Sequence, residues 1–76
     1  MEKPIAAIFG AVLRERREQA GISQEQLADR AGLHRTYVSL IERGKRTASI
    51  EVVRRVADAL GVSMADLIDK TEKRRG

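Results

Sequence analysis

Residues 21–44 read GISQEQLADRAGLHRTYVSLIERG, a stretch in which glycines separate two short segments of helical pattern. Ser23 followed three residues later by Gln26 is the pattern of a capping box, in which side chains and backbone N–H groups bond each other at the start of a helix. Apolar residues follow at helical spacing, and Gly32 is suited to the left-handed conformation that ends many helices. A short helix is therefore expected between Ser23 and Gly32.

The second segment predicts a helix from a boundary at His34 to about Arg43, with Gly44 as its stop. One side of this helix is polar and basic, whereas the opposite side is mostly apolar. The residues on the first side are Arg35, Thr36, Ser39, Leu40 and Arg43. Two short helices joined by a three- or four-residue turn that contains glycine have the proportions of a helix-turn-helix. Its second helix would fit the major groove of DNA, which is about 12 Å wide.

Three more helices are expected outside this stretch. Apolar residues at three- and four-residue spacing predict one from Pro4 to about Ala20, Ser49 can cap another that ends at Gly61, and Ser63 with Asp66 opens a short last helix. No β element, linker or internal repeat is indicated. The expected fold is all-α, a compact five-helix domain over residues 1–76, with an ordered core of about 5–69 and a charged, frayed tail over 70–76.

The formal net charge of +4 is concentrated in one part of the chain. Between Leu33 and Arg55, six basic residues stand against two acidic ones, and the remaining nine basic and nine acidic residues cancel. Such asymmetry favours a surface that meets a polyanion. An ordinary solvated surface is the alternative interpretation of the charge alone.

Several chemistries have no basis in the composition. The 76 residues include no cysteine and a single histidine, His34, and no carboxylates cluster on one expected face, so neither a metal site nor an acid–base pair can be assembled. We expect no enzyme activity, no cofactor and no small-molecule ligand. No basic-then-apolar leader is present, and no apolar run approaches the roughly 18 to 20 residues that span a bilayer, so the expectation is no membrane association and a cytoplasmic location.

The stretch from Gly21 to Gly44 resembles the Cro/repressor-type, or xenobiotic-response-element-like, helix-turn-helix family. The resemblance rests on Ser-Gln at the start of the first helix, Leu-Ala in its middle, Ser39 in the second helix, the Glu-Arg-Gly exit at 42–44 and Ala-Leu-Gly-Val at 59–62, and it covers about sixty residues. It implies a lambda-repressor-like fold and a DNA-binding transcription regulator encoded by a prokaryote or phage. Within that family, His-Arg-Thr-Tyr-Val-Ser at 34–39 is similar to the controller proteins of restriction-modification systems, which are dimers that regulate their own gene. Phage repressors and antitoxins share much of this pattern.

The resemblance assigns roles in DNA binding to two sets of residues. Arg35, Thr36 and Ser39 would read bases, since an arginine fork matches the O6 and N7 atoms of guanine and hydroxyl groups can bond base edges. Five residues would contact the DNA backbone: Gln24, Tyr37, Arg43, Lys45 and Arg46. Each of these has an alternative. Gln24 could instead brace a base-reading side chain or be a surface residue, and Tyr37 could instead be a core residue with an exposed edge. The three cations could instead belong to an ordinary solvated loop.

Arg17 and Glu42 match family positions that form a structural ion pair between the first helix and the end of the third. Arg16 stands where the family more often has an apolar residue, which puts the packing of the first helix in doubt near that point.

Four apolar residues near the end of the chain are expected to form a homodimer interface, because a core this small is unlikely to cover them all: Val62, Met64, Leu67 and Ile68. The alternative is that they complete the core of the monomer, and several could do both. A two-fold dimer would bind a pseudo-palindromic operator with its recognition helices about one DNA turn apart. RNA polymerase would be a further partner if the protein is an activator. The competing hypothesis is an antitoxin or adaptor that acts mainly through a protein partner.

Overall fold

The computed structural model describes residues 3–76, which form five α-helices and no strand. Their bounds are α1 Ile5–Gln19, α2 Gln24–Ala31, α3 Arg35–Glu42, α4 Ile50–Leu60 and α5 Met64–Arg75. The predicted all-α architecture with a helix-turn-helix formed by the second and third helices is confirmed, and four of the helices lie within a residue or two of their expected bounds.

The helix starts follow from their capping residues. Ser23 Oγ accepts the Gln26 backbone N–H at 3.0 Å, and the Gln26 side chain accepts the Ser23 N–H at 2.8 Å, so the predicted capping box is present at α2. Ser49 and Ser63 cap α4 and α5 through their hydroxyl groups in a similar way. The α2 helix ends at Gly32, whose φ of +68° is the left-handed conformation that favours glycine.

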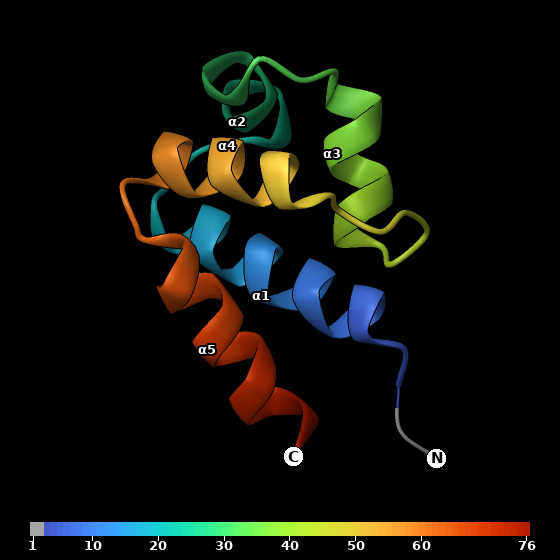
Figure 1. Cartoon of the computed structure of the whole chain (residues 1–76). Helices are drawn as coiled ribbons and strands as arrows, with labels where there is room; N and C mark the ends of the chain where they lie inside the picture. Colours follow the sequence, from blue (N-terminus) through green and yellow to red (C-terminus); the bar gives the residue numbers. More distant parts are fainter. Residues whose placement is uncertain (1–2) are drawn as a thin grey trace.

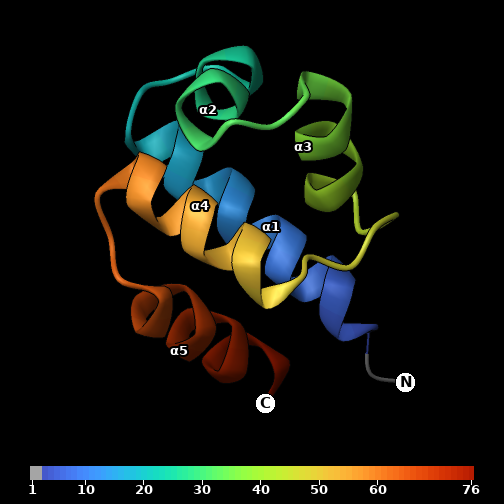
Figure 2. The ribbon, with the colours of Figure 1, turned by 45° about the horizontal axis from the view of Figure 1, so that its top comes forward.

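The α2–α3 pair and α5 lie at opposite ends of the molecule. Figure 1 shows α4 next to α1 in the middle of the molecule, with α2 and α3 at one end and α5 at the other, and the turned view in Figure 2 gives the same arrangement. The α1 helix packs against both α3 and α5, and α2 packs against α3 and α4. As a result, α1 and α4 form the support that carries the α2–α3 pair.

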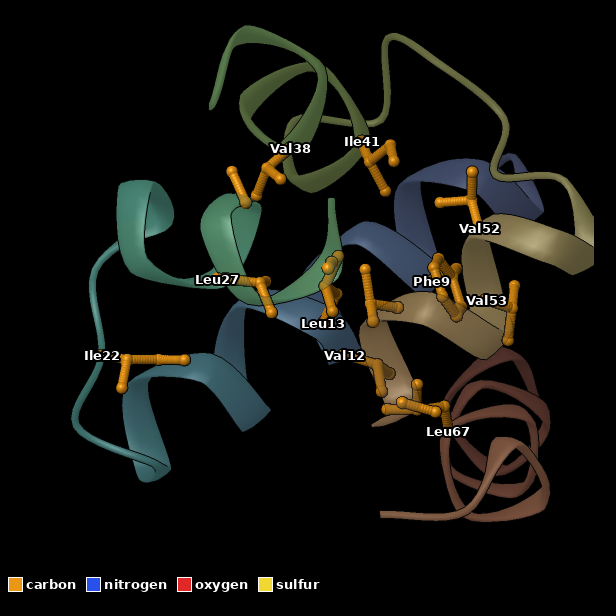
Figure 3. Packing of buried hydrophobic residues seen from close by; sticks show 14 residues of the cluster. Phe9, Val12, Leu13, Ile22, Leu27, Val38, Ile41, Val52, Val53 and Leu67 are labelled. Carbon is orange, nitrogen blue, oxygen red and sulfur yellow. The ribbon is translucent and has the colours of Figure 1, made fainter. Parts of the chain in front are cut away.

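All five helices contribute to one apolar core. Leu13, Leu27, Ile41, Val56 and Leu67 come from different helices and are fully buried, and the packing around several of them is shown in Figure 3. Each side chain of this size contributes about 1.5–3 kcal/mol when it is removed from water. The apolar side of α3 is thus anchored in the core, and its polar side remains at the surface.

The expectation of a short last helix with a frayed tail is wrong. The α5 helix continues to Arg75, Thr71 is buried, and its hydroxyl donates to the Leu67 carbonyl at 2.8 Å. Arg74 forms an ion pair with Glu15 of α1. The charged residues that suggested a tail are instead spaced for pairing along one helix, as Lys70 with Asp66 shows.

Arg16, whose packing was in doubt, forms an ion pair with Asp66 and so joins α1 to α5. Its Nε atom is buried and has no hydrogen-bond partner among residues 3–76. None of the helices over these residues is both long enough and apolar enough to cross a membrane.

Candidate nucleic-acid interface

The polar side of α3 and the start of α2 together form an open surface depression of about 250 Å³. It is lined by four residues, Gln24, Arg35, Thr36 and Ser39. The structure therefore brings the three predicted base-reading residues together and places Gln24 beside them. Arg35 and Thr36 are exposed, and Ser39 is half-buried.

The cations of α3 and of the loop that follows it have no acidic partner among the described residues. These cations are Arg35, Arg43, Lys45 and Arg46, and all four are exposed. Arg54 and Arg55 on α4 differ, because both pair with Glu51 and Arg54 also pairs with Asp58. The basic stretch recognised in the sequence thus divides into neutralised charges on α4 and unpaired charges at α3.

Tyr37 lies at the edge of this surface. It is half-buried and packs against the core, and the guanidinium of Arg46 lies over its ring, 5.6 Å from the ring centre. This distance is within the range of a cation–π interaction, which holds the loop residue Arg46 next to α3. Both earlier interpretations of Tyr37 are compatible with this position.

A hydrogen-bond network fixes α3 from behind. Arg17 donates to both carboxylate oxygens of Glu42, from Nε at 2.7 Å and from Nη2 at 3.0 Å. Its Nη1 donates to the Ile22 carbonyl at 2.9 Å. The bond to Glu42 is the largest cause of a raised pKa for Arg17. The ion pair that the resemblance implied is therefore present, and it joins α1, the α1–α2 turn and α3.

Gln24 belongs to the same network. Its side-chain amide donates to Glu42 Oε1 at 3.0 Å, and since a carboxylate only accepts, this bond fixes which way the amide points. The sequence predicts that Gln24 could brace a base-reading side chain, but it does not predict this contact with Glu42. No local signal could have found it, because 18 residues separate the two side chains.

The expected dimer residues are only partly at the surface. Leu67 is fully buried in the core, so its assignment to an interface is wrong, and it completes the core of the monomer instead. Val62 and Met64 are half-buried against the core, and Ile68 is exposed. Two exposed isoleucines were missed, Ile5 and Ile50.

Ile5 and Ile68 border a second depression, of about 170 Å³, that is almost wholly apolar. We call this hollow the apolar depression. Its lining is Ile5, Ala6, Phe9, Thr47, Ala48, Val53, Ile68 and Thr71. Ile50, 73% exposed, begins α4 two residues after Ala48. The residues of this apolar surface come from separate parts of the chain, so the surface forms only when α1, α4 and α5 pack together.

Within residues 3–76, no three His, Asp or Glu side chains are grouped so that they could hold a metal ion. The site is a surface of hydrogen-bond donors, hydroxyl groups and cations. Such a surface is suited to binding phosphates and base edges.

The helix-turn-helix family model HTH_3 matches residues 13–67, which includes α2, the turn and α3. The chain belongs to this family. In a helix-turn-helix the second helix is the one that enters the major groove, so α3 is the recognition helix and the depression beside Arg35 lies on its exposed side.

Relatives of the chain within this family include control proteins. The control protein C.BamHI of Bacillus amyloliquefaciens is 43% identical over 72 residues, which cover 93% of this chain and 89% of that protein. The solved structure of the restriction-modification controller protein C.AhdI of Aeromonas hydrophila has a TM-score of 0.80 at 42% identity and covers 82% of this chain and 94% of its own. The clp gene regulator ClgR of Corynebacterium glutamicum has a TM-score of 0.93 at 30% identity and covers 100% and 97%.

Proposed function

We propose that the chain is a sequence-specific transcription regulator that binds double-stranded DNA, reading a pseudo-palindromic operator as a homodimer. The observation that carries this proposal is the set of unpaired cations at α3, gathered beside a depression lined by Arg35, Thr36 and Ser39. The control proteins among its relatives support a regulator in particular.

Base recognition is assigned to the first half of α3. The Arg35 side chain is exposed and long enough to present its fork to a guanine, while the hydroxyl groups of Thr36 and Ser39 lie in the same depression. Gln24 has one amide N–H held by Glu42, which leaves its second N–H for a phosphate at the edge of the groove.

Backbone binding is assigned to the end of α3 and the following loop. Arg43, Lys45 and Arg46 are exposed and lack acidic partners within residues 3–76, so their charges are available to phosphates. Tyr37 supports Arg46 through its ring and can place its hydroxyl near the same phosphates. These contacts supply affinity that does not depend on base sequence.

The homodimer is proposed to form through the apolar depression and the exposed isoleucines around it. We propose a second copy of the chain as the partner at this surface. A two-fold axis gives both protomers the same depression and the same exposed isoleucines. Ile68 or Ile50 of one protomer can then fill the depression of the other. Val62 and Met64 would lie at the margin of this contact.

The regulated genes are proposed to include the protein's own gene, as in the controller proteins that the sequence resembles. RNA polymerase would be a partner if the protein activates transcription. We propose a DNA-binding protein of the prokaryotic or phage cytoplasm, in keeping with the family of regulators to which it belongs, and we assign it no catalytic activity and no cofactor.

The apolar depression also favours a second candidate function, that of an antitoxin or adaptor which holds a different protein on this surface.

One experiment separates the DNA-binding regulator from the antitoxin or adaptor. Fluorescence anisotropy should measure binding to the DNA upstream of the protein's own gene at several salt concentrations, with random duplex as the control. We expect nanomolar binding that exceeds the control about a thousandfold and weakens steeply with salt. Binding no stronger than to random duplex would overturn the proposed regulator of its own gene and favour the protein partner.

A further inference from the structure

The recognition helix rests on α1 through direct backbone contact. Gly10 of α1 is buried, and a Cβ atom at this position would lie 2.2 Å from the Ile41 carbonyl oxygen and 2.8 Å from the Glu42 carbonyl oxygen. Neither carbonyl belongs to a flexible side chain that could turn aside. The end of α3 can therefore come this close to α1 only because residue 10 has no side chain.

A second contact lies beside the first. Gly44 follows α3 with a φ of +73°, and a Cβ atom there would lie 2.8 Å from Ala7 Cα. Ala7 and Gly10 are three residues apart and so share one side of α1. Ala7 and Gly10 together form a contact surface without large side chains, called the seat below, on which the segment from Ile41 to Gly44 packs.

The two ends of α3 are attached to different parts of the molecule. Its first end follows the turn after α2, where the Leu33 N–H donates to the Ala28 carbonyl at 2.9 Å. Its last end is held by α1, at the seat and through the Arg17–Glu42 pair. An eight-residue helix is about 12 Å long, so a displacement of about 1 Å at the seat would tilt α3 about its first end and move Ser39 and the loop relative to Arg35.

We infer that Gly10 is a positioning residue for base recognition, which sets the tilt of α3 from the opposite side of the helix to the DNA. The inference rests on the proposed function. Base contacts are sensitive to such a tilt because good hydrogen-bond distances span only about 0.5 Å. Phosphate contacts made by long, exposed lysine and arginine side chains can adjust to it.

The test compares the variants Gly10→Ala, Gly44→Ala and Gly61→Ala with the wild type. Gly61 is the matched control for Gly44, because its φ is +69° and nothing lies within 4 Å of its would-be Cβ, whereas Gly44 meets Ala7. Both carry similar backbone strain, but only Gly44 meets α1. Because Gly44 also lies between the phosphate-binding residues Arg43 and Lys45, the ratio of operator to random-duplex affinity, and not either affinity alone, reports the contact with α1. For each protein, operator and random-duplex affinities are measured at a temperature where unfolding curves show it folded.

We expect Gly10→Ala and Gly44→Ala to weaken operator binding about tenfold or more, as expected when one bidentate base contact is lost, and to change random-duplex binding less than about threefold. Gly61→Ala should keep the wild-type ratio of the two affinities. If Gly10→Ala does not fold, Gly44→Ala against Gly61→Ala decides alone. An unchanged ratio in the folded seat variants would overturn the inference, and a wild type that does not prefer the operator would overturn the proposed function as well.

Discussion

Arg17 and Glu42 lie 25 residues apart in the chain and form a two-bond ion pair in which the guanidinium donates at 2.7 Å and 3.0 Å. The side chains are 12% and 2% exposed, so the pair is largely shielded from water. Gln24 adds a third bond to the same carboxylate. The pair thus links α1 to both helices of the helix-turn-helix, and its loss should lower the free energy of unfolding.

Replacing Glu42 with Gln should destabilise the fold by about 3 kcal/mol, because it leaves the Arg17 guanidinium shielded from water without an opposite charge. Urea unfolding followed by circular dichroism measures the change. Glu25→Gln is the control, since Glu25 is exposed and has no ion-pair partner within residues 3–76. Equal stability of the two variants would show that the pair contributes nothing.

Arg35→Ala and Lys45→Ala should affect DNA binding in different ways. Loss of Arg35 should cost about 1–3 kcal/mol of operator binding and leave random-duplex binding largely intact. Loss of Lys45 should weaken binding to both DNAs and reduce the salt slope by about 1 for each bound subunit. Anisotropy titrations at several salt concentrations measure both quantities. Equal losses on the two DNAs for Arg35→Ala would remove this residue from base reading.

Ile68→Asp should dissociate the homodimer, because it places a charge beside the apolar depression while its exposed position leaves the monomer core intact. Sedimentation velocity measures the association state, and operator affinity should fall with it. Leu67→Ala serves as a comparison for a buried neighbour, because truncating this side chain should lower the free energy of unfolding by about 2–5 kcal/mol. A dimer that survives Ile68→Asp would place the interface elsewhere.

Glu51 should make part of the stability depend on acid pH. Hydrogen bonds from Arg54 and then Arg55 lower its pKa to about 2 from the ordinary 4.5. Since the folded pKa is the lower one, the pairs stabilise the fold above about pH 4.5, and this contribution is lost as the pH falls toward about 2. Melting temperatures between pH 5 and 2 should therefore fall less for Glu51→Gln than for the wild type. Parallel curves would contradict the assignment, and Glu25→Gln should follow the wild type.

Local signals predicted most of the fold. Ser23 with Gln26, the serines at 49 and 63 and the glycines after the helices act within a few residues, so their pattern defines helix ends before any packing is known. The error at the end of α5 has a physical cause. Thr71 has little apolar character by itself, and it is buried only because α5 packs along α1 and its hydroxyl bonds the preceding turn.

The candidate site was predictable where one helix face carries it and not where several elements meet. Arg35, Thr36 and Ser39 share a side of α3 by spacing alone. The apolar depression joins Ile5 to Ile68, which are 63 residues apart, and no pattern within either helix links them. Gly10 gave a faint signal, because glycine inside a helix costs about 1 kcal/mol relative to alanine and usually reflects close packing.

The division between paired and unpaired cations also affects how the protein meets its ligand. Arg54 and Arg55 are neutralised by Glu51 and Asp58 together, whereas Arg35, Arg43, Lys45 and Arg46 have no acidic partners in the described chain. Most of the uncompensated charge therefore lies on the recognition side. A distant polyanion then exerts a torque that turns this side toward it before contact. The orientation of the encounter, and hence the rate at which DNA is found, is thus set by ion pairs on a helix that the DNA need not touch.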